Sequence, residues 1–193
     1  MAVTREYDEP PELKGRNVSV AGHLLASATA FFFLAFVFAY VYLRSLNSDH
    51  LWHPKHVHAP VTLGTVFAAL LVLSSVALQL VSRDERAGRF AGRAAKLGIA
   101  FALGIAALVV QVVEWASLGF GPADGGYASV FVGWTGFFFL FVILALIWIE
   151  VELAGAIRRP RDASPGVRAA SFYWSFIAGI GLLTWVVLYL VAP

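Results

Sequence analysis

Long apolar segments alternate with short polar ones along this 193-residue chain. Five of the segments stay apolar for about 20 residues or more, enough at 1.5 Å per residue to cross the roughly 30 Å hydrocarbon core of a bilayer. The pattern predicts five membrane-spanning helices, over about residues 22–43, 61–81, 94–118, 127–153 and 171–191. We therefore expect an all-α integral membrane bundle and treat residues 1–193 as a single transmembrane domain.

The polar segments between these spans are short. Residues 1–20 contain Pro10-Pro11 and charges of both signs, which is typical of a mobile or surface-bound tail. This polar start has no short apolar core followed by a small-residue cleavage site, so we expect no cleavable signal peptide.

Basic residues are distributed unequally between the two sides that five spans define. The tail, residues 82–96 and residues 156–170 fall on one side with twelve Lys and Arg, whereas the other side holds only Arg44 and Lys55. Positive residues favour the cytoplasmic side of a membrane protein. The split predicts a cytoplasmic N-terminus and an extracytoplasmic C-terminus.

The amino-acid composition excludes several kinds of functional site. Hydrophobic residues make up 60% of the chain, and the mean hydropathy is +0.77. There is no cysteine, which excludes disulfides, thiolate metal sites, iron–sulfur clusters and covalently attached haem. Phosphate-binding glycine loops and nucleophile motifs are missing too, and we expect no nucleic-acid partner.

A histidine-rich loop between the first two spans is the weak candidate for a metal site. Neutral imidazole binds zinc and copper, but Pro54 and Pro60 prevent a helix that would align the ligands. The alternative is a solvated loop that happens to be rich in histidine. The four candidate ligands are His50, His53, His56 and His58.

Glu114 is the only carboxylate inside the third span. An ionisable group within a span is expensive and commonly marks function, and Gln111 lies three residues earlier on the same helical face. The competing interpretation is that Glu114 lies close enough to the helix end to be solvated. Both interpretations remain open from the sequence alone.

Haem ligation within the membrane would need histidines that face the bundle interior. The only histidine outside the loop is His23, at the predicted cytoplasmic mouth of the first span. We therefore expect no catalytic residue and no cofactor in this chain. If it belongs to an enzyme, a partner carries the chemistry.

Residues 111–137 resemble subunit III of the haem–copper cytochrome c oxidases. The family has a Gln-x-x-Glu-aromatic element, a turn containing Asp-Gly-x-Tyr and a serine, and then Thr-Gly-Phe. The first and last spans also resemble their counterparts, and five helices match the family's short bacterial form. The matching polar residues are Gln111, Glu114, Asp124, Tyr127, Ser129 and Thr135.

The chain also departs from the family pattern in its spans. Thr29 stands where the family has a glutamate linked to proton uptake, and two histidines are replaced by Phe138 and Phe141. A third histidine, in the last helix, is replaced by Ser175. These changes suggest that apolar or small groups replace the inner polar network, which leaves Gln111 and Glu114 as the remaining polar pair.

The resemblance implies a non-redox accessory subunit in a bacterial plasma membrane. Such a subunit packs against the haem-bearing subunit I and other oxidase subunits, binds phospholipid, and supports assembly and sustained proton uptake. The haem and copper would lie in the partner subunits. Two alternatives remain: a subunit-III-like protein of a nitric oxide reductase, or a free-standing metal-handling protein that uses the histidine loop.

Overall fold

The computed structural model describes residues 10–47, 52, 57–160 and 162–191. These parts of the chain form helices and no strands, in agreement with the expected all-α class. The elements are α1 (Pro11–Ser45), α2 (Val61–Arg86), α3 (Arg93–Ser117), α4 (Gly126–Arg158), α5 (Pro165–Trp185) and the π-helix η1 (Val186–Leu190). Five long helices, the last formed by α5 and η1 together, are apolar enough to span a membrane, as the apolar segments of the sequence predicted.

The polar tail was predicted too long, because residues 11–20 are the first turns of α1. Pro11 at the first helical position has its φ angle already fixed near the helical value, so it favours a helix start. At 35 residues, α1 is about 52 Å long and exceeds the roughly 30 Å hydrocarbon core. Hydropathy marks the apolar part of such a helix and misses its polar end.

The other helices also extend beyond their predicted apolar segments at the end where α1 begins. α2 continues to Arg86 and α4 to Arg158, and α5 already begins at Pro165. Arginines in the last turn of α2 and α4 interact favourably with the negative end of the helix dipole. We call this the basic end of the bundle and the opposite one the far end.

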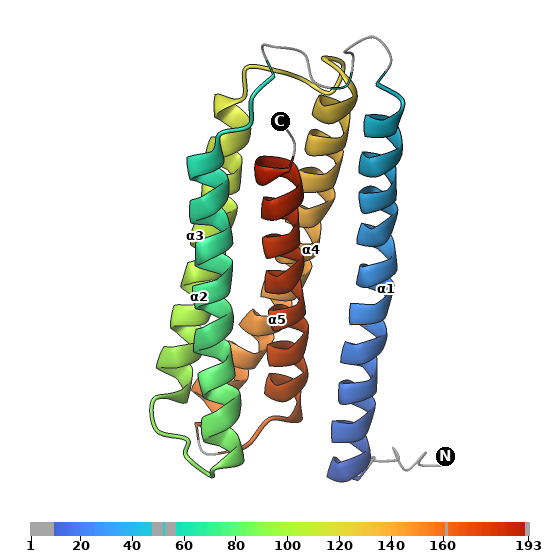
Figure 1. Ribbon diagram of the computed structural model, residues 1–193. Coiled ribbons are helices and arrows are strands. Elements are labelled where there is room, and N and C mark those ends of the chain that lie inside the picture. The colour runs from blue at the N-terminus through green and yellow to red at the C-terminus, as the bar shows by residue number, and fades with distance from the viewer. Residues whose placement is uncertain (1–9, 48–51, 53–56, 161, 192–193) are drawn as a thin grey trace, which may run out of the picture.

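The helices pack as an antiparallel bundle in which α5 lies between α1 and α2 (Figure 1). α2 and α3 lie side by side, α3 also packs on α4, and α1 packs chiefly on α5 and α4 (Figure 1). The last helix ends at the far end, and the α2–α3 and α4–α5 connections lie at the basic end (Figure 1). α1 is the least buried of the five spans.

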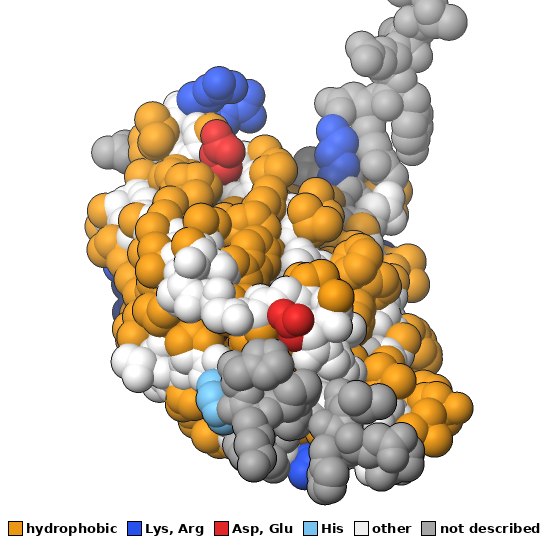
Figure 2. Space-filling view, turned by 90° about the horizontal axis from the view of Figure 1, so that it is seen from above, with side chains coloured by type: hydrophobic (Ala, Val, Ile, Leu, Met, Phe, Trp, Pro, Cys, Tyr) orange, Lys and Arg blue, Asp and Glu red, His pale blue; other side chains and the backbone are white. Residues whose placement is uncertain are grey.

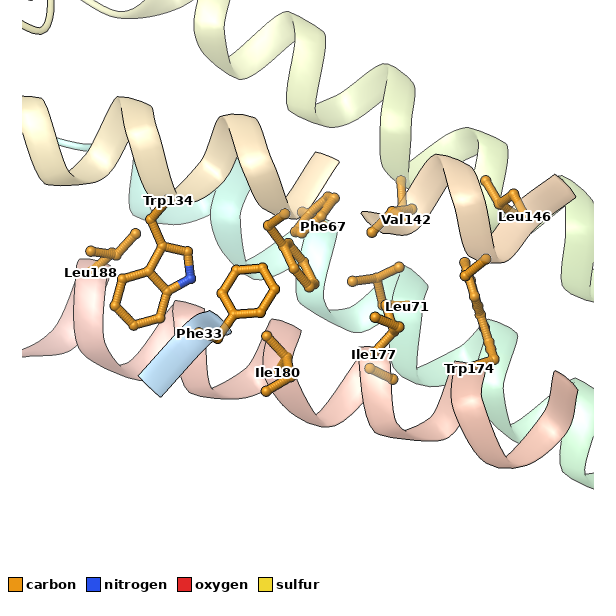
Figure 3. Close-up of a cluster of buried hydrophobic side chains, with 14 of the residues drawn as sticks. Phe33, Phe67, Leu71, Trp134, Val142, Leu146, Trp174, Ile177, Ile180 and Leu188 are labelled. Carbon is orange, nitrogen blue, oxygen red and sulfur yellow. The ribbon is translucent and has the colours of Figure 1, made fainter. Parts of the chain in front are cut away.

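The core runs between the helices as a continuous cluster of large apolar side chains (Figure 3). Phe33 of α1, Leu71 of α2, Trp134 of α4 and Ile177 of α5 are all fully buried there. Away from the core, hydrophobic side chains are plentiful on the surface. A view onto the far end shows only scattered charged side chains among them (Figure 2). An apolar exterior is expected of a bundle that faces lipid.

Candidate functional site

The carboxyl group of Glu114 is buried in the bundle and lies near the end of α3, so the structure favours the buried interpretation over the solvated one. The residue is 0% exposed. Its Oε2 accepts a hydrogen bond from Gln111 Nε2 at 2.5 Å, and its Oε1 accepts one from the Tyr189 hydroxyl at 2.6 Å. Both carboxyl oxygens are therefore satisfied by neutral donors.

Tyr189 reaches Glu114 from the π-helix η1, which follows α5. A π-helical turn has an extra residue, which changes the direction of the side chains that follow and is frequent at functional sites. The Tyr127 hydroxyl of α4 donates to the Leu188 carbonyl in this turn at 2.6 Å. The site thus joins α3, α4 and the end of the last span.

Gly64 of α2 provides the space that the Tyr189 ring occupies. A Cβ atom at position 64 would overlap the ring, with Tyr189 Cζ only 2.6 Å away. On its other side the ring packs edge-on against Phe131, with 5.5 Å between ring centroids. A small residue on α2 and an aromatic on α4 therefore fix the ring whose hydroxyl reaches Glu114.

The remaining motif residues hold the polypeptide around this site. Asp124 Oδ2 accepts a hydrogen bond from the Gly121 backbone N–H at 2.7 Å, and the Ser129 hydroxyl donates to the Pro122 carbonyl at 2.5 Å. Both bonds close the connection between α3 and α4. Thr135 accepts a hydrogen bond from Trp115 Nε1 at 3.1 Å, which links α4 to α3.

The predicted motif thus divides into two groups. Gln111, Glu114 and Tyr127 belong to the buried polar site, whereas Asp124, Ser129 and Thr135 fix the turn and the helix pair. Sequence reasoning missed Gly64 and Tyr189 as parts of the site. Tyr189 lies within the π-turn, and no local signal in the sequence marked it as a partner of Glu114.

The positions that depart from the family pattern are only partly apolar. Phe138 is fully buried and packs edge-on against Phe33 and Phe67, at centroid distances of 5.6 and 5.8 Å. Thr29 Oγ1 lies 3.2 Å from the Tyr173 hydroxyl. An aromatic cluster therefore occupies part of the space where the family has polar residues.

A second, partly buried polar cluster corrects the expectation that Gln111 and Glu114 are the only polar pair left. The Ser175 hydroxyl accepts hydrogen bonds from Ser75 Oγ at 2.9 Å and from Gln79 Nε2 at 2.7 Å. Next to it, Trp174 Nε1 donates to Ser74 Oγ at 2.9 Å. Ser and Gln replace the family's histidine without making this interface apolar.

Most of the histidine-rich loop lies outside the residues that the structure describes. His50, His53 and His56 lie outside it, and His58 is the only one of the four within it. Among residues 10–47, 52, 57–160 and 162–191, no three His, Asp or Glu side chains are grouped closely enough to hold a metal ion. The weak metal prediction therefore stays a prediction.

Charged partners are found at the basic end instead. Arg93 Nε lies 2.6 Å from Glu85 Oε1, and Asp84 forms ion pairs with Arg89 and Lys96. No ion pair within the described residues includes Glu114. A carboxyl group with two neutral donors and no cation can hold or release a proton, and it can tie neighbouring helices together.

Comparison with known proteins finds one family that matches nearly the whole chain. A family model for cytochrome c oxidase subunit III matches residues 13–192. The chain is 27% identical over 190 residues to cytochrome c oxidase subunit 3 of Cyprinus carpio, covering 95% of this chain and 72% of the relative. Cytochrome c oxidase subunit 3 of Osphranter robustus is 27% identical over 173 residues, covering 86% and 66%.

Proposed function

The chain belongs to the cytochrome c oxidase subunit III family, and from this premise we propose that it is a non-catalytic accessory subunit of a respiratory haem–copper oxidase. The family match over residues 13–192 is the observation that carries the proposal. In this role the chain packs in the membrane against the haem-bearing subunit I. Electron transfer to oxygen and the coupled proton translocation then take place in the partner subunits, which hold the haem and copper.

The chemistry of the chain supports an accessory role. It has no cysteine, and the described spans carry no histidine pair that could ligate a haem from inside the bundle. The described part has five long apolar helices and many exposed hydrophobic side chains. Such a surface suits burial against lipid and against the spans of other subunits.

We further propose that the subunit supports assembly, phospholipid binding and sustained proton uptake. Arginines at the basic end suit anionic lipid head groups, because each basic residue near an anionic surface contributes about 1 kcal/mol. Thr29 cannot carry a proton as a glutamate would. Because Thr29 stands where the family has the glutamate, we propose that the subunit contributes mainly to assembly and lipid binding. Its effect on proton uptake is then indirect.

The Glu114 site is proposed to hold the far end of the subunit in the shape that its partner recognises. Hydrogen bonds from Gln111 and Tyr189 link α3 to η1, and Tyr127 links η1 to α4. Losing Glu114 would leave two buried donors without their acceptor, which costs stability in a bilayer where water is absent. Assembly is then the property most sensitive to this residue.

Purification in mild detergent tests the proposed role. A tagged chain should copurify with subunits that show a haem spectrum and reduce oxygen, whereas the chain alone should show neither haem absorbance nor stoichiometric copper. Copurification with a complex that reduces nitric oxide but not oxygen would replace the proposal by the reductase alternative. A metal bound to the isolated chain and lost on substitution of His53, His56 and His58 would support metal handling.

Orientation and location need their own test. We propose a bacterial plasma membrane, with the N-terminus in the cytoplasm because the basic residues cluster on that side. A reporter fused after Pro193 should be active only outside the cytoplasm, and one fused at Met1 only inside. A C-terminal reporter that is active in the cytoplasm would overturn the orientation.

A further inference from the structure

A row of polar side chains runs along the interface between α2 and α5, from the basic end towards the middle of the bundle. Ser75, Gln79 and Ser82 share one face of α2 at helical spacing, and Ser171 and Ser175 lie one turn apart on α5. The two helices lie side by side and antiparallel (Figure 1), and Ser75 and Gln79 donate across the interface to Ser175. We call these five residues the α2–α5 seam.

The Ser175 hydroxyl, at the end of the seam nearer the middle of the bundle, is fully hydrogen-bonded. Ser175 accepts from Ser75 and Gln79, and its own hydroxyl donates to the Ser171 carbonyl at 2.7 Å. A hydroxyl has one proton to donate and two lone pairs, so Ser175 has no capacity left. From Ser175 towards the far end, the neighbouring core is apolar, and Leu71, Ile177 and Ile180 fill the space (Figure 3).

Ser171, one turn nearer the basic end, has an unsatisfied hydroxyl. The Ser171 hydroxyl is buried, since the residue is 1% exposed, and it has no hydrogen-bond partner among the described residues. A buried polar group without a partner costs about 1–3 kcal/mol, and native structures usually satisfy such groups with ordered water. The hydroxyl therefore points to a ligand that can donate or accept a hydrogen bond.

A cleft at the basic end provides the entrance. It has a volume of about 320 Å³ and is lined by polar and charged residues that include Ser82, Glu85, Arg86 and Arg168. Ser82 belongs to the seam and is itself buried, and Arg86 donates to its hydroxyl at 3.4 Å. Ser82 is therefore the seam residue that the cleft reaches, and Ser171 lies one turn further along α5 from Arg168 of the lining.

We propose that the α2–α5 seam binds a short file of water molecules, which enters from the cleft at the basic end and satisfies the Ser171 hydroxyl. The file stops at Ser175, one turn beyond the start of the predicted apolar segment at Ser171, so it reaches about 6 Å into a roughly 30 Å hydrocarbon core. No seam residue is titratable, so the seam itself stores no proton. The charged groups that face its entrance are Glu85, Arg86 and Arg168.

Because this chain has no cysteine, a single thiol introduced into it is the only S–H band that remains after the spectrum of the wild-type complex is subtracted. We would replace Ser171 by cysteine and follow exchange of its S–H group in D₂O by infrared difference spectroscopy on the assembled complex. Ala170→Cys is the matched control, since Ala170 lies at the same depth and is also buried, at 3% exposed. A group that exchanges only through local opening is slow, so Ser171→Cys should exchange at least about tenfold faster than Ala170→Cys.

Equal, slow exchange at both positions would overturn the proposal. A second variant keeps the test decisive if a cysteine disturbs the packing. If the seam is dry, Ser171→Ala removes an unsatisfied hydroxyl and should raise the thermal midpoint of the complex. If water satisfies the hydroxyl, the midpoint of Ser171→Ala should stay at or below that of the wild type.

Discussion

Two buried carboxylates at opposite ends of the bundle are stabilised in different ways. Glu85, at the basic end, pairs with the guanidinium of Arg93 at 2.6 Å, and both side chains are less than one-tenth exposed. Glu114, nearer the far end, has only the neutral donors Gln111 and Tyr189. One carboxylate is compensated by a charge and the other by hydrogen bonds alone.

The difference follows from what surrounds each group. Arg93 also donates to the Asp162 carbonyl at 2.5 Å, so its guanidinium joins α2, α3 and the α4–α5 connection next to two open clefts. Glu114 lies among aromatic side chains, where a second charged residue would have to be desolvated as well. A tyrosine hydroxyl and an amide satisfy its oxygens at less cost.

The largest expected effect comes from breaking the charged pair on one side. Arg93→Met should destabilise the subunit by about 3–5 kcal/mol, because it leaves Glu85 as an uncompensated buried charge. Thermal unfolding and retention of the subunit in the purified complex would measure the loss. The double variant with Glu85→Leu and Arg93→Met should recover most of it. Wild-type stability of Arg93→Met alone would show that water already compensates Glu85.

The positions of these two carboxylates show how far sequence reasoning reaches. The five spans were predictable, because each needs only a local run of apolar residues. Gln111 and Glu114 were predictable as a pair, because three residues on a helix place them on one face. Local spacing was sufficient for both features.

Contacts between distant segments were not predictable in this way. Glu85, Arg93 and Asp162 come from three parts of the chain, and of the three only Arg93 entered the sequence argument, as one of the basic residues counted for orientation. Tyr189 meets Glu114 through a π-turn, which no hydropathy pattern indicates. The start of α1 at Pro11 was missed because its first turns are polar.

A smaller effect is expected when the neutral site loses its acceptor. Glu114→Ala should cost about 3 kcal/mol, since Gln111 and Tyr189 are left as buried donors without a partner. Glu114→Gln keeps an acceptor oxygen and should lose less than half as much. Oxidase activity, proton pumping and subunit retention in membranes would measure both variants.

The results for Glu114→Ala and Glu114→Gln distinguish a role of Glu114 in assembly from a proton-carrying role and from no essential role. With Thr29 in place of the family's glutamate, we expect neither variant to abolish pumping while the subunit remains bound. Loss of pumping with full retention would instead assign a proton-carrying role to Glu114. Wild-type behaviour of both variants would show that the buried carboxyl contributes little to assembly.

The space around Tyr189 allows a test that leaves every charge in place. Gly64→Ala should cost about 2 kcal/mol, because the added methyl group overlaps the Tyr189 ring and forces it away from Glu114. Gly98→Ala is the matched control, since a Cβ atom there meets nothing within 4 Å. The control should be neutral or slightly stabilising, as alanine favours a helix over glycine. Equal effects of the two changes would contradict the close packing at Gly64.

The smallest expected effect comes from removing one neutral donor. Tyr189→Phe deletes the hydroxyl that lies 2.6 Å from Glu114 Oε1 but keeps the ring against Phe131. A single hydrogen bond contributes about 1 kcal/mol net, and Gln111 still satisfies the other oxygen. We therefore expect a loss of about 1 kcal/mol in the free energy of unfolding in mixed micelles, clearly below that of Arg93→Met. Tyr42→Phe, on the exposed side of α1, serves as the control and should leave stability unchanged. A loss for Tyr189→Phe as large as that for Arg93→Met would mean that Glu114 depends on this hydroxyl as strongly as Glu85 depends on its guanidinium.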